Sequence, residues 1–266
     1  MKRVLLLDGY NLLYRARSGF AKGDHPIIFN FFRSLRPLVE KFNPDVAYFV
    51  LEGRPKARLA QDSNYKAQRV YHDRDDFNRQ RKKIIEIMRE SFPITVARHE
   101  DYECDDVIMN LATDRHKDDK CFIVSSDTDF IQVLQNDCDI SLYNPVRKQF
   151  ISPPEFDYVS WKALRGDAAD NIPGFKGIGD KTANKLMLSP DLLTEFLNKE
   201  GHQEKFDHNV KMISAHNMDD DMGTIEETTA KFQPDSLRKM FTEYGFYAMT
   251  NKTSWPKFVN TFDCLV

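Results

Sequence analysis

The sequence predicts an α/β fold in which a mostly parallel β-sheet is flanked by helices, and three observations lead to this prediction. Short, continuous apolar runs occur at 4–7, 47–51 and 121–124, as is typical of strands buried on both faces. Segments with helical periodicity lie between them, and strands that alternate with helices favour a parallel sheet. Each run also leads into acidic residues, which fits a ligand site beyond the carboxyl ends of the strands.

The first half of the chain contains the first two of these strands. Gly9 permits a tight turn after the first strand, and the helical region that follows carries Arg15 near the acidic end of that strand. Asn43-Pro44 ends an amphipathic helix, and Pro93 ends another. In order, the expected elements are a strand at 4–7, a helical region at 10–17, a helix at 27–42, a strand at 47–51 and a helix at 77–92.

The alternation resumes until Ser152-Pro153-Pro154 interrupts the chain. We therefore expect a sheet-containing domain at 1–155 and a helical lobe at 156–266. The expected elements are a strand at 94–97, a helix at 103–116, a strand at 121–124, a helix at 130–135, a strand at 140–143, a helix ending near Asp170, a helix beginning near Asp180, and further helices after 189.

The size and composition favour a globular intracellular protein. The chain has 266 residues, enough for one large domain or for a domain with an appended lobe. Its four cysteines form no Cys-x-x-Cys pair, which favours a reducing compartment without structural disulfides. No apolar run approaches the length of a membrane span, and the charged start leads only into a short strand. We therefore expect a protein that is neither secreted nor associated with a membrane.

The segment Glu103-Cys104-Asp105-Asp106 places three carboxylates within four residues. Like charges at this spacing raise each other's pKa and oppose folding unless a cation compensates them. In a helix, Glu103 and Asp106 share one face. The alternative is a solvent-exposed acidic helix start, which the helix dipole favours.

Acids at three predicted strand ends favour the metal-site interpretation over that alternative. Parallel strands would bring these ends to the same edge of the sheet as the acidic helix start. Oxygen ligands suit Mg²⁺ or Mn²⁺, and no Cys/His set has the spacing of a zinc site. The expected metal-site residues are Asp8, Glu52, Glu103, Asp105, Asp106, Asp127 and Asp129.

A basic stretch follows the second predicted strand. Residues 54–83 contain ten basic and four acidic residues, a net charge of +6, with Tyr65 and Tyr71 among them. Basic and aromatic side chains beside an acidic metal site suit a nucleic-acid backbone, because Lys and Arg meet phosphates and Tyr stacks on bases. The alternative is a solvent-exposed charged helix.

A glycine-rich turn at 174–179 lies between two predicted helices. It would place backbone N–H groups and the ammonium of Lys181 where a phosphate can bind. The alternative is an ordinary turn between helices. Asp167 and Asp170 precede the turn at the i, i+3 spacing and are candidates to complete the metal cluster from a second lobe.

Together these motifs resemble the 5′-nuclease family of phage and bacterial 5′-3′ exonucleases, polymerase nuclease domains and flap endonucleases. The resemblance extends from Val4 to Leu186 and rests on LLLDGYNLLYR, the block from Glu52-Gly53 to Arg69, YECDD, SSDTDF and RGDAADNIPGFKGIGDKTANKL. It implies a PIN-like domain, a helical arch at about 66–100 and a helix-three-turn-helix motif at about 161–187.

The resemblance also implies the roles of individual residues. Lys66 and Arg69 would contact the scissile phosphate as catalytic residues. One metal ion would be held by Asp8, Glu52, Glu103 and Asp105, a second by Asp105, Asp127, Asp129 and Asp167, and Asp106 and Asp170 would lie around them. Where the family has Asp-Gly, this chain has Glu52-Gly53, so the longer side chain would bind its metal directly or through water. The implied DNA-binding residues are Tyr10, Arg15, Tyr65, Lys176, Gly177, Gly179, Lys181 and Lys185.

The implied activity is a metal-dependent, structure-specific nuclease that acts at 5′ ends and flaps of DNA and on RNA primers paired to DNA. Two Mg²⁺ or Mn²⁺ ions would activate a water and stabilise the leaving 3′ oxygen, and K⁺ is a candidate ion at the helix-three-turn-helix turn. We expect a monomer that meets any polymerase or single-strand-binding protein in trans. The alternatives are a non-catalytic DNA-binding protein and a PIN-type ribonuclease for single strands.

Overall fold

The computed structural model describes residues 1–69 and 75–266, and these form a seven-stranded sheet with strand order β6-β5-β4-β1-β2-β3-β9. Strands β1 to β5 run parallel, and the two edge strands β6 and β9 are antiparallel to their neighbours. The strands are β1 Arg3–Asp8, β2 Val46–Leu51, β3 Thr95–Arg98, β4 Lys120–Val124, β5 Ile140–Asn144, β6 Gln149–Ile151 and β9 Glu226–Thr228. The predicted α/β class with a mostly parallel sheet is confirmed.

The central strand β1 shows why the sheet forms where the apolar runs lie. Residues 4–7 are fully buried, and they alternate between two hydrophobic cores on opposite faces of the sheet. β2 and β4 flank this strand, with Leu6 paired to Tyr48 on one side and to Ile123 on the other. Both faces of β1 therefore need a cover of helices.

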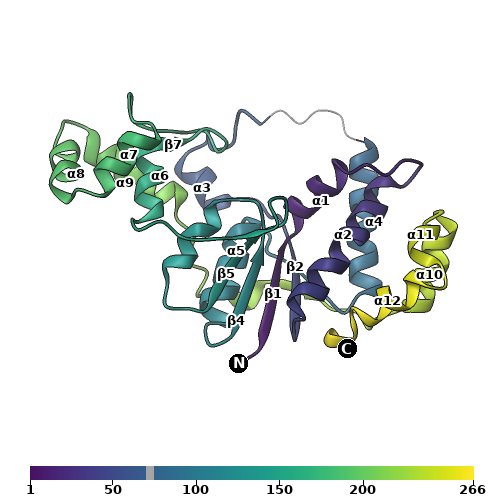
Figure 1. The fold of residues 1–266 in the computed structure, drawn as a ribbon. Coiled ribbons are helices and arrows are strands. Elements are labelled where there is room, and N and C mark those ends of the chain that lie inside the picture. The colour runs from purple at the N-terminus through teal and green to yellow at the C-terminus, as the bar shows by residue number, and fades with distance from the viewer. Residues whose placement is uncertain (70–74) are drawn as a thin grey trace.

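Helices cover the two faces of the sheet in separate layers (Figure 1). One layer consists of α1 Gly9–Arg17, α2 Pro26–Phe42 and α4 Asp75–Ser91. The other contains α5 Cys104–Asn110, its π-helical continuation Leu111–Arg115 and the 3-10 helix Asp129–Gln135. A short helix, α3 Lys56–Gln61, follows β2.

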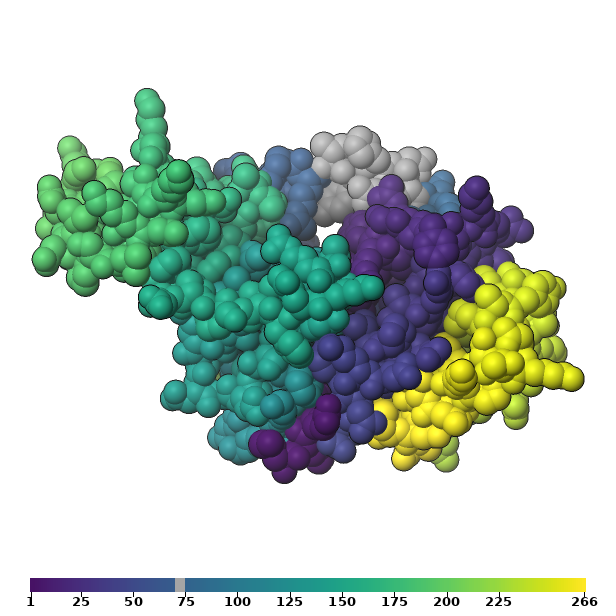
Figure 2. All heavy atoms as spheres, viewed as in Figure 1, coloured from purple at the N-terminus to yellow at the C-terminus, as the bar shows by residue number. Residues whose placement is uncertain are grey.

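A helical lobe extends from one side of the sheet, as Figures 1 and 2 show. It contains α6 Tyr158–Arg165, α7 Asp180–Met187, α8 Pro190–Leu197 and α9 His202–Ile213. A two-residue ladder between β7 Gly166–Asp167 and β8 Ile172–Pro173 closes the loop after α6. The loop requires glycine at Gly174, where a Cβ would lie 2.0 Å from the Arg165 carbonyl oxygen.

The chain after this lobe returns to the sheet. β9 pairs with β3, and α10 Pro234–Glu243, α11 Tyr247–Thr250 and α12 Ser254–Asn260 join the core beside α2 and α4. The ring of Phe32 lies 5.1 Å from that of Phe241, and the ring of Phe92 lies 5.1 Å from that of Phe262. The packing therefore differs from the expected grouping of 156–266 into one helical lobe, because these aromatic residues cover the outer face of α2 and α4.

Part of the segment 66–100, which was expected to form an arch, instead packs in the core and in the sheet. Phe77, Ile84 and Met88 of α4 are buried in the core that includes α2, and Thr95–Arg98 is a strand of the sheet. The apolar periodicity of α4 explains this packing, since its buried side chains need a partner surface. Residues 70–74, which include Tyr71, lie outside the described residues. Among the described residues, no helix combines the length and apolar character needed to cross a bilayer.

Candidate active site

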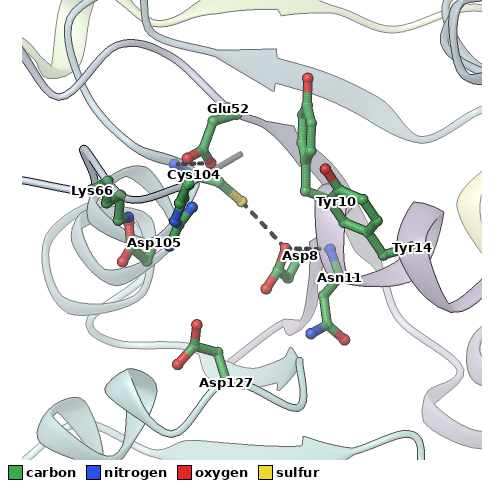
Figure 3. Close-up of a pocket in the computed structure, with 10 residues that line it drawn as sticks. Asp8, Tyr10, Asn11, Tyr14, Glu52, Lys66, Cys104, Asp105 and Asp127 are labelled. Atoms are coloured by element: carbon green, nitrogen blue, oxygen red, sulfur yellow. Dashed lines mark hydrogen bonds between the residues drawn. The ribbon is translucent and has the colours of Figure 1, made fainter. Parts of the chain in front are cut away.

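A cavity of about 490 Å³ opens at the carboxyl-terminal edge of the sheet. The neighbouring parallel strands β1 and β2 end at Asp8 and just before Glu52, and α5 carries Asp105 in its first turn. Figure 3 shows these carboxylates around the hollow, together with Lys66 and two tyrosines. The lining consists of Asp8, Tyr10, Asn11, Tyr14, Glu52, Lys66, Arg69, Cys104, Asp105 and Asp127.

Hydrogen bonds fix Asp8 at the end of β1, including a long one from the Cys104 thiol at 3.7 Å. Its carboxylate accepts from the Asn11 backbone N–H at 3.0 Å, which caps α1, and from Ser125 Oγ at 2.6 Å. Burial nevertheless raises the pKa of Asp8 to about 6, and the nearby Asp127 and Asp105 carboxylates add to the increase. A bound cation would favour the charged form of this side chain.

Glu52 extends from the end of β2 toward the same cavity. The Cys104 backbone N–H donates a hydrogen bond to Glu52 Oε2 at 3.2 Å. Burial raises the pKa of Glu52 to about 8, and repulsion from Asp105 and Glu103 contributes to this increase. A cation bound beside Glu52 would favour the charged form of this side chain.

The chemistry of the donors fits a hard divalent cation. The buried Cys104 thiol donates to the Val50 carbonyl oxygen at 3.3 Å, and burial raises the pKa of this thiol well above its usual value. Cys104 therefore stays protonated and supplies no thiolate ligand. The remaining donors are carboxylate oxygens, which Mg²⁺ and Mn²⁺ prefer.

Carboxylate oxygens also converge in two compact groups among the described residues. Within each group the ligand atoms lie within 4.8 Å of one another, a spacing that one ion could bridge. Asp127 lies near both groups, and its backbone N–H donates to Ser125 Oγ at 3.0 Å. The groups are Glu103, Asp105 and Asp106, and Asp129, Asp167 and Asp170.

Lys162 is a site residue that sequence reasoning missed. This lysine of α6 is 5% exposed, contacts Asp129, and lies 2.6 Å from Asp167 Oδ2. Burial raises the pKa of Asp129 to about 7, while the Lys162 ammonium opposes the increase. The available signal was the position of Lys162 beside the apolar pair Ala163-Leu164, five residues before Asp167.

Arg58 of α3 is a second missed residue, and all five of its N–H donors are used. Its guanidinium donates to Glu103 Oε2 at 2.6 Å and to both Asp106 oxygens at 2.6 and 2.9 Å. It also donates to the carbonyl oxygens of Met212 and Ser214, both at 3.0 Å. Arg58 thus joins α3, the acidic start of α5 and the end of α9.

The segment 64–69, which follows β2 and α3, lies against the loop after α6. Lys66 contacts Glu103 and lies 3.5 Å from Asp170 Oδ2, and Arg69 donates to Asp170 Oδ1 at 2.8 Å. The Tyr65 hydroxyl lies 2.9 Å from Glu103 Oε2 and 3.0 Å from Asp170 Oδ2. Tyr65 is only 4% exposed, so its ring is buried. The expectation was a ring on the surface that could stack on a base.

The other predicted DNA-binding residues lie in two places. Tyr10 lines the cavity, whereas Arg15 is not part of the cavity lining that the structure describes. The predicted DNA-binding residues of the glycine-rich turn and of α7 are exposed in the helical lobe, outside the cavity. These exposed residues are Lys176, Gly177, Gly179, Lys181 and Lys185.

The structure brings the predicted acids together in one region. Asp8, Glu52, Asp105 and Asp127 line the cavity, while Glu103 and Asp106 face Arg58. Asp129 and Asp167 flank Lys162, and Asp170 faces Lys66 and Arg69. The expected division of these acids into two sets of metal ligands stays a prediction.

Comparison with solved structures supports the fold. The D15 flap endonuclease of bacteriophage T5, solved in a pseudo-enzyme-product complex with DNA and metal ions, is similar in fold, with a TM-score of 0.60. The two sequences are 16% identical, and the match covers 98% of each chain. It therefore includes the sheet, the helical lobe and the returning C-terminal segment.

Sequence comparison identifies the family. DNA polymerase I of Treponema pallidum (strain Nichols) is 30% identical over 207 residues, which is 70% of this chain and 20% of that protein. The thermostable DNA polymerase I of Thermus aquaticus is 33% identical over 204 residues, or 70% of this chain and 24% of that protein. The chain thus spans about a fifth to a quarter of these relatives. Residues 3–159 match the model of one family, and the chain belongs to that family, 5′-3′ exonuclease, N-terminal resolvase-like domain.

Proposed function

We propose that the protein is a structure-specific, divalent-metal-dependent nuclease that hydrolyses phosphodiester bonds near 5′ ends and flaps of DNA. The observation that supports this most is the cavity at the sheet edge. There, the carboxylates of Asp8 and Glu52, whose pKa values are raised by burial, share the cavity lining with Lys66 and Arg69. Membership of the 5′-3′ exonuclease family favours the same activity.

Mg²⁺ or Mn²⁺ ions would be held by the carboxylates of the cavity and of the adjoining acidic group, with Asp105 between the two sets. Bound there, such ions would supply an acidified water and charge stabilisation at the phosphate. The candidate ligands are Asp8, Glu52, Glu103, Asp105, Asp127, Asp129 and Asp167, with Asp106 and Asp170 around them.

The cationic side chains of the cavity would act on the phosphate itself. Lys66 pairs with Glu103 in the structure, and its side chain is partly exposed beside the hollow. With the Glu103 carboxylate engaged as a metal ligand, the Lys66 ammonium would be released to turn to the scissile phosphate and offset the charge that develops there. Arg69, which also lines the cavity, would bind the same phosphate, and the Tyr10 ring would stack on a base.

The helical lobe would bind the duplex by its backbone. Lys176, Lys181 and Lys185 are exposed around the turn before α7, where backbone N–H groups and ammonium groups can meet phosphates. The carbonyl groups of the same turn are a candidate K⁺ site. Contacts of this kind read no base edges, so we expect little sequence preference.

A single cleavage assay tests the proposal. The protein is incubated with 5′-flap, nicked, blunt and RNA-primed duplexes and with unstructured RNA, each with and without Mg²⁺. We expect metal-dependent cleavage near the 5′ end of the flap and nicked substrates. Binding without hydrolysis would favour a non-catalytic DNA-binding protein, and equal cleavage of unstructured RNA would favour a single-strand ribonuclease.

A further inference from the structure

One face of α9 packs against the glycine-rich turn of the helical lobe. Its residues recur at spacings of three and four, and they are His202, Lys205, Asn209 and Met212. The ring centre of Phe175 lies 4.9 Å from that of His202 and 5.0 Å from Lys205 Nζ. Met212 packs at the other end of this face, in a small core beside α6 and β8. This face of α9 therefore supports the turn from the interior of the lobe.

Two polar side chains on this face donate hydrogen bonds to backbone carbonyl groups at the start of the turn. Lys205 Nζ donates to the Gly174 carbonyl oxygen at 2.7 Å. Asn209 Nδ2 donates to the carbonyl oxygens of Ala163 at 2.9 Å and of Pro173 at 3.0 Å. Two consecutive carbonyl groups of the turn, and one of α6, are therefore tied to a single helix.

Neither of these side chains has another polar partner of its own. Lys205 is partly buried and forms no ion pair with an acidic residue that the structure describes. Asn209 is only 1% exposed, so its amide is out of reach of any DNA bound at the surface. Because a buried polar group costs free energy unless it is hydrogen-bonded, these bonds favour one position of the turn.

The next part of the turn carries free backbone donors. The N–H groups of Lys176, Gly177 and Gly179 donate to no residue that the structure describes, and all three residues are exposed. Gly177 has a φ of 81°, a conformation that favours glycine. Neighbouring free N–H groups can bind phosphate oxygens. The peptide groups of residues 173 and 174 precede these donors, so fixing their carbonyl groups helps to set the direction of the donors.

We propose that Lys205 and Asn209 are positioning residues that hold the glycine-rich turn in the conformation that binds duplex phosphates. Neither side chain contacts DNA itself. Loss of either set of hydrogen bonds lets the carbonyl groups of residues 173 and 174 move, and the N–H groups after them lose their common direction. The inference rests on the proposed role of the helical lobe in binding duplex, and it adds two residues of α9 to that role.

Binding of a blunt DNA duplex in Ca²⁺, followed by fluorescence anisotropy at several salt concentrations, tests this role. Lys205→Met keeps an apolar side chain beside Phe175 but removes the donor to Gly174. It should weaken duplex binding about threefold to tenfold, as expected for one hydrogen bond, and leave the salt slope unchanged. A slope reduced by about one phosphate contact would show that Lys205 meets DNA directly and would overturn the proposal.

A double-mutant cycle with Lys181→Ala gives a second readout, because Lys181 lies in the first turn of α7 directly after the glycine-rich turn. If Lys205 positions this region, Lys181→Ala should cost less affinity in the Lys205→Met protein than in the unaltered protein. Additive losses would indicate two independent contacts and would contradict the proposal. Lys211→Met is the matched control, since it removes an exposed lysine of α9 that has no hydrogen bond to the turn, and it should change the affinity by less than about twofold.

Asn209→Ser tests the same role without any change of charge. The shorter side chain cannot reach both carbonyl groups, so duplex affinity should fall about threefold to tenfold with the same salt slope. Circular dichroism and thermal unfolding check that the variant is folded. Because Asn209 is buried, a loss of affinity in the folded variant acts through the turn. Unchanged affinity in folded Asn209→Ser would overturn the proposal.

The failure of this inference and that of the proposed function give different results. Duplex binding by the unaltered protein that neither Lys205→Met nor Asn209→Ser weakens would count against the positioning role alone. Failure of the unaltered protein to cut any DNA in Mg²⁺, with duplex binding intact, would count against the nuclease and not against the positioning role. Absence of duplex binding by the unaltered protein would overturn both the positioning role and the proposed role of the lobe.

Discussion

At the scale of single residues, basic side chains lie directly among the acidic ones. Lys66 contacts Glu103, Lys162 contacts Asp129 and Asp167, and Arg58 contacts Glu103 and Asp106. Each of these cations compensates charge that would otherwise oppose folding. The distinction that matters for function is between a cation that holds carboxylates in place and one that can turn to the substrate.

Lys66 is expected to be of the second kind. Lys66→Ala should lower the single-turnover cleavage rate at saturating enzyme by about 10²-fold or more, because it removes a positioned charge that acts on the developing negative charge. Rapid-quench measurement of flap cleavage checks this rate. An effect confined to affinity, with the saturated rate intact, would show that Lys66 only binds DNA.

Glu52 makes the metal-free protein sensitive to pH. The pKa of its carboxyl is raised from an ordinary value of 4.5 to about 8, so between these pH values the unfolded chain has lost a proton that the folded chain retains. The free energy of unfolding should therefore fall as the pH rises, by at most about 1.4 kcal/mol per pH unit from this group. Above about pH 8 the contribution of Glu52 becomes constant.

Thermal unfolding in EDTA across this pH range measures the effect. Glu52→Gln should flatten the decline, and Mg²⁺ should raise the melting temperature more at pH 8 than at pH 6, because bound metal displaces the proton. Glu155→Gln, at an exposed position outside the site, is the control. An unchanged slope in Glu52→Gln would show that Glu52 is not the titrating group.

The predicted acids lie close together in the structure, whereas two buried cations among them were not predicted. An acid directly after an apolar strand is placed by the sheet itself, so Asp8 and Glu52 could be located from local pattern alone. Arg58 and Lys162 look like surface residues of a charged segment and of an amphipathic helix. Their burial depends on carboxylates that lie 45 and 33 residues away in sequence.

At the scale of elements, Arg58 connects α3 with α5 and α9 through buried hydrogen bonds. Arg58→Met should lower the free energy of unfolding by about 3 to 5 kcal/mol, since it leaves Glu103 and Asp106 buried without their partner. Arg58→Lys should recover only part of this loss, because an ammonium cannot replace five planar N–H donors. Urea unfolding in EDTA gives both values.

Lys56→Ala is the matched control for Arg58, because it removes a cation from the same short helix. The Lys56–Asp101 pair is exposed, with side chains 72% and 42% accessible, so the change should be below about 1 kcal/mol. Comparable losses in the Lys56 and Arg58 variants would mean that the buried network contributes nothing specific.

The helix α7 is expected to bind duplex away from the reacting phosphate. Lys181→Ala should weaken binding and reduce the salt slope by about one phosphate contact, with the saturated cleavage rate little changed. Lys257→Ala, on α12 at the other end of the molecule, controls for the loss of one exposed charge. A large fall in the saturated rate of Lys181→Ala would contradict this division between binding and chemistry.

At the scale of the whole molecule, the sheet could be predicted because β1, β2 and β4 are continuous apolar runs with a helix between successive strands. The return of the chain to the sheet after the helical lobe could not be predicted from the sequence. β9 is a three-residue exposed edge strand without an apolar pattern, and the aromatic residues of α10 and α12 fit a local core as well as a distant one. Their docking on α2 and α4 is set by tertiary contacts.

In the proposed function, the same arrangement would allow one chain to combine chemistry with recognition of DNA structure. The helical lobe and α4 lie on opposite sides of the sheet (Figure 1), and the acidic cavity opens at the sheet edge. In the proposed complex, duplex contacts and single-strand contacts meet at the metal site. Cleavage would then require both parts of the substrate, although neither part needs a defined sequence.

The most direct test of the central claim separates cleavage from binding in Asp127→Asn. This substitution removes one negative charge from the acidic cavity and leaves the exposed lysines of α7 unchanged. We predict that flap cleavage in Mg²⁺ is abolished while the dissociation constant for duplex stays within about twofold. Asp139→Asn, an exposed acid that pairs with Lys120, should leave both quantities unchanged. Cleavage by Asp127→Asn within about threefold of the unaltered protein would contradict a metal-dependent nuclease site at this cavity.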